Sequence, residues 1–578
     1  MNNTYLFLFS ISPVQSFISQ ARKTKDLYAG SVLLSNFIKN QIEFLKKEKT
    51  DAEIIFPMWK NNSDKNGQSL PNRFVAKINA ESDDEIVLLG QKLQKNFKDI
   101  LKKRFENLPD IISKGPNKDI YLNQVLNIFE SYWAAVKEED NNYQNNYIKL
   151  EKIHAAAKNI KKFKQLNNGN GEQGRKCSLC GERNAYFYGN YDLPAFINEN
   201  FGTKICDSRI QFTKNEALCT ACSIKRFYNV SFPSIAEITL KGTIPEDKIA
   251  ELSFDAELFY DENLTQTYFK KNNMPVSRLD EIKNRRNKIL EKNNLKASSL
   301  PKYYALIMFD GDNMGKFLAG DFLREETNLE EFHKILSMVL SEGAKKARNI
   351  VDKYGKTVYA GGDDFLGFVP LKSLMPVLKE LRTIFKEYVN DRLNKFIQKE
   401  ITISAGIAIA HYKIPLKTVL DWARTMEKEA KEKSRDSFAI AVLKHSGEIH
   451  KTVWKWYDSG KSNVDRIEKI LHKLIKKKFS ANFIHALEEE FRKLSSEENI
   501  LVYKKQFQAE LKRLIAKSIL LQNNSDSVQN IAKQKEREKE ELYNLCNKLF
   551  LKAFEDTENY FSLMKIVDFI ARHLGGER

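Results

Sequence analysis

The sequence lacks any long hydrophobic run and contains few cysteines and histidines. No apolar stretch approaches the ~18–20 residues that are needed to cross a membrane. The short run from Tyr5 to Ile11 has no basic leader and is followed by Pro13, which argues against a signal peptide. The 8 histidines are scattered along 578 residues, and none lies in a motif that would mark it as a general base. These absences predict a cytoplasmic protein with no membrane partner.

Positive charge, in contrast, is in excess. Lys and Arg number 94 against 76 Asp and Glu, which gives a formal net charge of +18. A chain of this length should form about three to five compact units. Its basic character favours a polyanion partner such as RNA or a DNA backbone. The alternative is a lysine-rich coding bias, because asparagine is abundant too.

Five of the six cysteines lie between positions 177 and 222. Cys177 and Cys180 form one CxxC pair, and Cys219 and Cys222 form another. Two such pairs can complete a closed tetrahedral site for structural Zn²⁺. The alternatives are a redox pair or disulfides, which are rare in cytosolic proteins. Cys206 is a spare that either replaces a ligand or is an ordinary buried thiol, and Cys546 is expected in the core of a C-terminal helix.

A glycine-glycine-aspartate-aspartate turn separates two short apolar runs near the middle of the chain. The runs on either side of Gly361-Gly362-Asp363-Asp364 are rich in β-formers, which predicts a hairpin. The glycines leave room for a phosphate or sugar to approach the backbone. Asp363 and Asp364 are then expected at an exposed tip, where carboxylates can hold divalent cations. The alternative is an ordinary solvated hairpin tip.

A second acidic loop lies upstream, after a run predicted to be a buried strand. Tyr304 to Phe309 is apolar and ends at Asp310. The loop residues that follow, before a helix-like stretch, are Gly311, Asp312, Asn313, Met314 and Gly315. A plain Asx-type turn would explain Asp310 and Asp312 separately. Together with the hairpin, however, the pattern is typical of a palm domain, whose carboxylates can hold two Mg²⁺ or Mn²⁺ ions about 4 Å apart.

A third segment fits the same domain. Ile401 to Ala410 is an apolar strand, and Leu416 to Lys433 has apolar residues at helical spacing. The strand 438–443 follows. Lys431 near the end of this helix suits the helix macrodipole. In a palm domain of the nucleotide-cyclase kind, Lys431 would instead reach a triphosphate.

The sequence resembles the large catalytic subunit of type III CRISPR effector complexes, of the Cmr (III-B) subtype. The resemblance covers roughly residues 1–450. It rests on several blocks that occur in order and at the family's spacing: SPVQSFI from Ser12, FPSIAE from Phe232, FDGDNMG from Phe309, AGGDDFL from Ala360, ISAGIAIAHYKIPL from Ile403 and AIAVLKHSG from Ala439. The GGDD turn alone would also fit a diguanylate cyclase, but the N-terminal block and the cysteine insertion would not.

This resemblance implies an α+β fold with two ferredoxin-like palm (nucleotide-cyclase-like) domains, a zinc-binding insertion and an all-helical C-terminal domain. The expected units are a first palm domain over 1–242 with a four-cysteine zinc insertion at about 166–228, a helical linker domain over 243–300, a second palm domain with the GGDD motif over 301–448, and a helical domain over 449–578. The first palm domain is expected to close with a strand at 232–241. Many members also begin with an HD-type nuclease domain, but no histidine here is followed by aspartate. DNA cutting by such a domain is therefore not expected.

The resemblance also implies a function. The chain is expected to be an ATP-using nucleotidyltransferase that releases pyrophosphate and is activated when the guide crRNA of its complex pairs with target RNA. Asp310 and Asp363 would ligate Mg²⁺ or Mn²⁺, with Asp364 as a helper. The nucleotide would contact the 311–315 loop, Gly361, Gly362 and Lys431. Ser12, which is also suited to capping a helix over 13–40, would help to hold the second nucleotide.

The expected product is a cyclic oligoadenylate or AMP joined to S-adenosylmethionine, and the palm motifs do not choose between them. Partners implied by the family are the other subunits of the complex, crRNA and target RNA. The rival interpretations are a catalytically idle scaffold subunit and a free diguanylate cyclase. The clustered carboxylates argue against the idle scaffold, because an unused site has no reason to keep like charges together.

Overall fold

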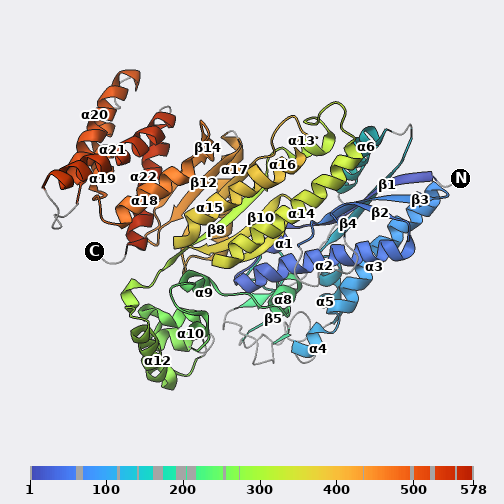
Figure 1. Ribbon diagram of the computed structural model, residues 1–578. Helices are drawn as coiled ribbons and strands as arrows, with labels where there is room; N and C mark the ends of the chain where they lie inside the picture. The colour runs from blue at the N-terminus through green and yellow to red at the C-terminus, as the bar shows by residue number, and fades with distance from the viewer. Residues whose placement is uncertain are drawn as a thin grey trace.

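An antiparallel sheet of four strands forms the N-terminal part of the computed structural model (Figure 1). The strand order is β2-β3-β1-β4, from β1 (Asn3–Ser12), β2 (Glu53–Phe56), β3 (Arg73–Ala80) and β4 (Glu130–Lys137). Helices α2 (Thr24–Glu48) and α3 (Asp83–Phe105) cover one face, and α6 (Tyr143–Asn159) covers the other. Residues of β1 alternate between these two cores, as the period of two in a strand requires.

The structure describes thirteen stretches of the chain, and every structural statement below concerns these residues: 3–59, 69–112, 118–139, 142–160, 174–189, 203–204, 216–251, 255–272, 274–433, 435–494, 500–520, 528–553 and 556–575. Within them, no helix has both the length and the apolar character that a membrane crossing requires.

A six-stranded sheet lies at the centre of the molecule. Its order is β13-β12-β11-β8-β10-β9. Only the β11–β12 pair is parallel. The strands are β8 (Tyr303–Gly311), β9 (Lys356–Gly361), β10 (Asp364–Pro370), β11 (Ile403–His411), β12 (Ser437–Leu443) and β13 (Ile449–Lys455). The order β11-β8-β10-β9 is that of a ferredoxin-like sheet, and the N-terminal sheet has its four strands in the same relative order.

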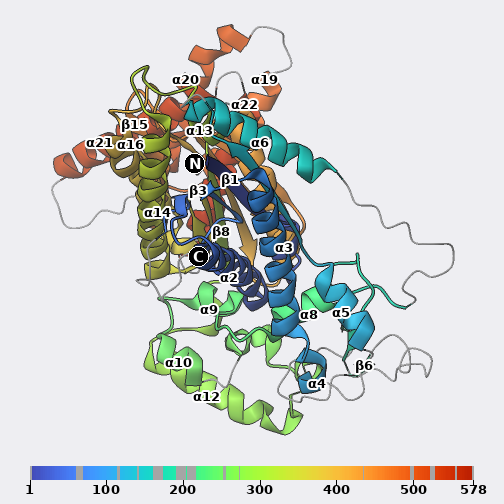
Figure 2. The same ribbon diagram turned by 90° about the vertical axis from the view of Figure 1, so that its right-hand side faces the viewer.

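Helices cover both faces of this central sheet. Helix α14 (Leu329–Tyr354) and helix α15 (Leu374–Thr383), which continues as a π-helix over Ile384–Val389, pack on one face. Helix α17 (Leu416–Glu432) packs on the other face, as its apolar periodicity predicts. The N-terminal part lies beside α14, where Lys77 pairs with Glu330 at 2.8 Å and Tyr143 contacts His333 at 2.9 Å (Figure 2).

The region from 449 onward is mostly but not entirely helical, so the prediction of an all-helical domain is wrong. Strand β13 extends the central sheet through pairing with β12, and the hairpin β14 (Tyr457–Asp458)–β15 (Lys461–Ser462) follows. The helices are α18 (Asn463–Ile475), α19 (Asn482–Leu494), α20 (Ile500–Ser518), α21 (Val528–Lys552) and α22 (Thr557–Leu574). Cys546 is buried in α21, as predicted.

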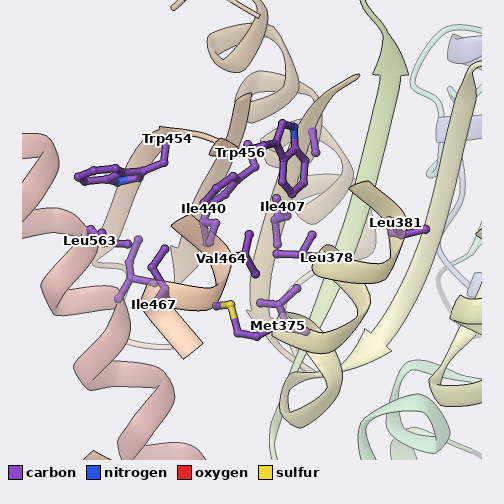
Figure 3. Close-up of a cluster of buried hydrophobic side chains, with 14 of the residues drawn as sticks. Met375, Leu378, Leu381, Ile407, Ile440, Trp454, Trp456, Val464, Ile467 and Leu563 are labelled. Carbon is purple, nitrogen blue, oxygen red and sulfur yellow. The ribbon is translucent and has the colours of Figure 1, made fainter. Parts of the chain in front are cut away.

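The C-terminal helices share a core with the central sheet. Figure 3 shows Met375 of α15, Ile407 of β11, Trp456, Ile467 of α18 and Leu563 of α22 in one apolar cluster. The indole of Trp456, 1% exposed, donates to the carbonyl of Ile403 at 2.8 Å. This continuous packing fixes α18 and α22 against the sheet.

The outer strand β13 is also held by a single side chain of α22. The amide of Val453 donates to Asn559 Oδ1 at 2.8 Å, and Asn559 Nδ2 donates to the Val453 carbonyl at 2.9 Å. Thr452 Oγ1 donates to Asn559 Oδ1 at 2.8 Å. The carboxamide therefore makes the hydrogen bonds that a neighbouring strand would make.

Two local predictions fail for identifiable reasons. The segment 232–241 is not a strand, because Ser234 and Glu237 form a capping box that begins helix α9 (Ile235–Leu240). The helix expected over 13–40 is divided into α1 (Gln15–Ser19) and α2, and Ser12 is the last residue of β1. Ser12 caps no helix, because the residue before α1 is Val14.

Two small groups of helices lie outside the two sheets and the C-terminal helices. Helices α10 (Glu246–Glu251), α11 (Gln266–Lys271) and α12 (Leu279–Lys292) join α9 in a separate apolar core below the central sheet (Figure 1). Arg286, within the basic run of α12, is buried and pairs with Asp261 at 2.7 Å. Helices α4 (Leu108–Ile112) and α5 (Lys118–Leu126) follow α3.

Replacing Gly406 by alanine should destabilise the central sheet. The added Cβ would lie 2.0 Å from the Ala423 carbonyl oxygen and 2.3 Å from the Glu427 amide nitrogen, both backbone atoms of α17. Overpacking of this kind costs about 1–3 kcal/mol or more, so Tm should fall by several degrees in a thermal unfolding experiment. Gly315→Ala is the control, because no atom lies within 4 Å of its added Cβ. Equal Tm values for Gly406→Ala and the wild type would contradict this packing.

Candidate functional site

The GGDD turn joins β9 to β10 and lies beside the end of β8. Gly362 has a φ of +68°, which favours glycine at the turn. Phe365 of β10 pairs with Phe309 of β8, so the residues before it reach the level of Asp310. A Cβ on Gly311 would lie 2.8 Å from the Asp363 Cβ. The structure therefore brings the hairpin and the acidic loop into contact across neighbouring strands.

Negative charge is concentrated at this contact. Crowding by the surrounding protein, which leaves Asp363 partly exposed, and the nearby Asp310 carboxylate raise the pKa of Asp363 to about 7. Asp364 keeps a solvent-exposed edge, but crowding by protein and its hydrogen bond with Asp310 raise its pKa well above the usual range. Burial and the same three carboxylates raise the pKa of Tyr359. An added cation would relieve this repulsion.

The oxygen donors fit a hard divalent cation such as Mg²⁺ or Mn²⁺. The three aspartates do not enclose an ion by themselves, because the only group of three or more ligand atoms within 4.8 Å among the described residues consists of cysteines. Mg²⁺ is commonly bound through one or two carboxylates, with substrate phosphates and water completing its shell. An open carboxylate site of this kind fits a cation that arrives with a nucleotide.

Lys431 reaches this site from the last turn of α17. Its ammonium donates to Asp310 and also to Glu427, at 2.6 Å, one turn earlier on the helix. Burial disfavours the charge, but the hydrogen bonds to Asp310 and Glu427 outweigh it and raise the pKa of Lys431. Glu427 was not predicted as a site residue, although an acid four residues before a lysine is a recognisable helical pair.

Asp312 has a different environment from Asp310. It is 1% exposed, and its carboxylate accepts hydrogen bonds from Thr402 Oγ1 and Ser404 Oγ, both at 2.7 Å, and from the Asp436 amide at 2.9 Å. These contacts fasten the acidic loop to β11 and to the start of β12. Asn313 follows with a φ of +59° at the start of α13 (Met314–Ala319). A nucleotide contact through Asp312 stays a prediction.

Two segments of the N-terminal part also reach the site. Ser69 Oγ accepts from Arg348 at 2.7 Å and from the Ala360 amide at 3.4 Å, next to the GGDD turn. The Gln15 carbonyl accepts from Arg424 of α17 at 3.3 Å. Neither Ser69 nor Gln15 was predicted, because nothing in the sequence places them beside residues about 290 and 410 positions away. Ser12 ends β1 opposite Glu130, and its nucleotide role stays a prediction.

The four predicted cysteines come together. Their sulfur atoms all lie within 4.8 Å of one another, and those of Cys180 and Cys219 are 3.7 Å apart. Four thiolates about 2.3 Å from one Zn²⁺ would be separated by such distances. Hydrogen bonds from neighbouring thiols, first from Cys177, lower the pKa of Cys180. The donor set fits zinc, and Cys206 lies outside the described residues.

The cysteines are carried by two stretches, 174–189 and 216–227, which we call the cysteine module. Cys177 and Cys180 lie in a turn that closes at Gly181, whose amide donates to the Cys177 carbonyl at 2.9 Å and whose φ is +69°. Cys219 and Cys222 lie at the start of helix α8 (Thr220–Phe227). Strand β5 (Phe187–Tyr188) pairs with β6 (Thr203–Lys204) and with β7 (Ala217–Leu218). The pairing of β5 with β7 joins the two stretches.

Two family models match the chain. Residues 303–439 match the model of the Cas10/Cmr2 second palm domain, and residues 6–109 match that of the N-terminal region of the CRISPR-associated protein Cmr2. These two segments belong to the Cas10/Cmr2 family. This confirms the family predicted from the sequence, and it identifies the central sheet as a palm domain.

Curated relatives agree with these two matches. The Cmr2 subunit of the Pyrococcus furiosus Cmr system is 24% identical over 573 residues, covering 78% of this chain and 63% of that protein. The Cas10/Csm1 single-strand-specific deoxyribonuclease of subtype III-A from Streptococcus thermophilus is 24% identical over 209 residues, covering 35% and 26%. The chain thus spans less than two thirds of these relatives.

Solved structures support the Cas10/Cmr2 fold. A chain of the type III-B Cmr-beta complex in its apo state superposes with a TM-score of 0.62 at 14% identity, covering 91% of this chain and 78% of that one. The corresponding chain of Cmr-beta bound to cognate target RNA gives 0.61 at 15% identity, covering 91% and 80%.

Cation binding at the carboxylates should depend on pH. The pKa of Asp363 is about 7 in the folded chain and about 3.9 in an unfolded one. Between these values the folded state holds a proton that the unfolded state has lost, so stability falls as pH rises. Mn²⁺ replaces that proton, and it should therefore raise Tm clearly at about pH 8 and little at about pH 5.

Asp363→Asn should remove most of this Mn²⁺ effect, and the exposed Asp391→Asn should preserve it. An equal Mn²⁺ effect on Tm at both pH values would contradict a site made of proton-holding carboxylates.

Loss of zinc should unfold the cysteine module. Cys219→Ser should lower the metal content from about one Zn²⁺ per chain and decrease Tm, and a strong chelator should do the same to the wild type. Metal analysis by atomic absorption checks the content. Cys206→Ser is the control and should keep its zinc. Full zinc content in Cys219→Ser would exclude this residue as a ligand.

Proposed function

We propose that this chain is the nucleotidyltransferase subunit of a type III-B CRISPR effector complex, with ATP as substrate. The observation that carries the proposal is the crowding of Asp310, Asp363 and Asp364 in a Cas10/Cmr2 palm domain, beside the cationic Lys431. Raised carboxylate pKa values are a common property of functional sites. A scaffold subunit has no physical reason to keep these charges together.

In the proposed reaction, the 3′-hydroxyl oxygen of one nucleotide attacks the α-phosphorus of another. The bond from that phosphorus to pyrophosphate breaks, and the hydroxyl proton passes to solvent. A Mg²⁺ or Mn²⁺ ion, when bound, would lower the pKa of the attacking 3′-hydroxyl and neutralise charge on the α-phosphate. Asp310 and Asp363 would hold the cation, with Asp364 as a helper.

The other residues of the site have supporting roles. Lys431 places an ammonium group beside the carboxylates, where a triphosphate is expected, and Glu427 holds it there. Gly362 keeps the hairpin surface free of a side chain, because no atom lies within 4 Å of a Cβ added there. Gly361 instead packs against protein, since its added Cβ would lie 2.5 Å from the Tyr359 hydroxyl and 2.9 Å from the Ser69 carbonyl oxygen, and its contact with nucleotide stays a prediction. Asp312 keeps the 311–315 loop attached to β11.

We further propose that the N-terminal sheet is the first palm domain. Its four strands have the same ferredoxin-like order as the central sheet. Its segment around Gln15 contacts α17, which carries Lys431, and Ser69 accepts from the Ala360 amide of β9, next to the GGDD turn. A second nucleotide could therefore be held between the two sheets, where Ser12 remains a candidate contact.

The partners follow from the relatives. Cmr2 of Pyrococcus furiosus is a subunit of a Cmr system, and a chain of Cmr-beta with cognate target RNA has the same fold. We propose that this chain assembles with the other subunits of such a complex, crRNA and target RNA. Its net charge of +18 suits contact with RNA. The product would be a cyclic oligoadenylate or AMP joined to S-adenosylmethionine.

The test is product formation by the assembled complex with target RNA, labelled ATP and Mn²⁺ or Mg²⁺, with and without S-adenosylmethionine. Mass spectrometry should identify an adenylate product that requires target RNA. Asp363→Ala/Asp364→Ala should lower the rate by about a thousandfold or more, because the cation loses its carboxylates. Asp391→Ala, on an exposed helix surface of the same domain, should leave the rate unchanged.

The other outcomes separate the rival interpretations. A complex that binds target RNA but forms no product under any condition would indicate a scaffold subunit. A preference for GTP, without any need for RNA, would indicate a diguanylate cyclase.

A further inference from the structure

Two adjacent cations of the cysteine module reach into the N-terminal part of the chain. Lys225 is fully buried, and its ammonium donates to the carbonyl oxygens of Phe17 and Gln20. It also lies 4.7 Å from the centre of the Phe17 ring. These contacts fix residues 13–23, which we call the β1–α2 segment.

Arg226 makes a second connection to the start of α2. Its guanidinium donates to both carboxylate oxygens of Asp26, at 2.8 and 2.9 Å, and to those of Glu216, at 3.0 and 3.1 Å. All three side chains are buried. Because a buried charge is costly without its partners, this arrangement tolerates little displacement of α8 relative to α2.

A third connection lies at the surface. Glu182, two residues after Cys180, accepts a hydrogen bond from Gln20 Nε2 at 2.6 Å. The Glu182 side chain is 56% exposed. Each CxxC pair therefore has a nearby residue that binds Gln20. Lys225 binds the backbone carbonyl of Gln20, and Glu182 binds its side chain.

The opposite side of the β1–α2 segment contacts α17. Arg424 donates to the Gln15 carbonyl at 3.3 Å, and Ile18 and Ala21 pack in the apolar core that includes Ala423. Arg424 lies one turn before Glu427, which holds Lys431. An unbroken series of contacts thus joins the cysteine module to the helix that bears Lys431.

We propose that Lys225 and Arg226 are positioning residues that hold the β1–α2 segment against α17, so that occupancy of the cysteine centre governs nucleotide binding at the carboxylate site. The last step of this inference rests on the proposed function, whereas the positioning of the segment does not. Zinc would act here only by fixing the start of α8, from which Lys225 and Arg226 extend.

Lys225→Met in the full chain tests the positioning. Methionine keeps an apolar chain next to Phe17 but cannot donate to the two carbonyl groups. Hydrogen exchange followed by mass spectrometry should show about tenfold faster exchange in residues 13–23, because charge-assisted hydrogen bonds are lost, while zinc content stays at the wild-type level. Lys176→Met is the matched control, because Lys176 lies next to Cys177 and, among the described residues, its ammonium donates to the Glu182 carbonyl alone, at 3.2 Å.

ATP binding with Mn²⁺ tests the coupling to the carboxylate site. In Lys225→Met, the KM and Kd for ATP should rise about tenfold with little change in kcat, because the segment positions substrate rather than reacting with it. Chelation of zinc from the wild type should produce the same two changes. Glu182→Ala removes the surface contact with Gln20 together with an ion pair to Arg183. It should give a smaller increase in exchange, and it keeps the test valid if Lys225→Met does not fold.

Three results would overturn the inference in different places. Unchanged exchange in residues 13–23 for both variants would exclude the positioning role. Faster exchange with unchanged ATP affinity would exclude the coupling. A wild-type complex that binds no ATP would refute the proposed function together with the coupling, and the exchange measurement would then decide the positioning role alone.

Discussion

The close approach of α17 to β11 at Gly406 governs the geometry of the candidate site. The backbone of the helix contacts the strand where any side chain larger than hydrogen would intervene. This contact sets the height of Glu427 and Lys431 above the end of β8, and hence the pairing of Lys431 with Asp310. It also fixes the side of α17 that contacts the β1–α2 segment. The carboxylates can remain crowded because β8 and the β9–β10 hairpin hold them, and α17 holds Lys431 beside them.

Elements of the central sheet could be predicted from the sequence because their apolar pattern is local. The expected strand 401–410 and helix 416–433 differ from β11 and α17 by no more than two residues at either end. Predictions failed where tertiary contacts decide the structure. Strand β13 is such a case, because it is defined by its pairing with β12. The strand predicted at 232–241 failed for a local reason, because a capping box of Ser234 and Glu237 begins α9 in a segment that otherwise resembles a strand.

The candidate site shows the same division. The GGDD turn, Asp310 and the four cysteines are recognisable because their spacing reflects their chemistry. The different environments of Asp310 and Asp312 are not recognisable, because only the folded chain brings Thr402 and Ser404 to Asp312. Ser69 and Gln15 likewise reach the palm domain only through the packing of distant segments, and no local pattern marks them.

The carboxamide of Asn559 has a consequence for the solubility of the palm domain. An outer strand with free N–H and C=O groups can pair with another molecule, which is a common route to aggregation. In this chain, Asn559 occupies those groups of β13 at Val453, and α22 lies over the strand. The last helix therefore protects the sheet edge in addition to packing on its core. A palm domain cut after residue 448 would lose both β13 and this cover, and it would expose β12 as a new edge open to pairing.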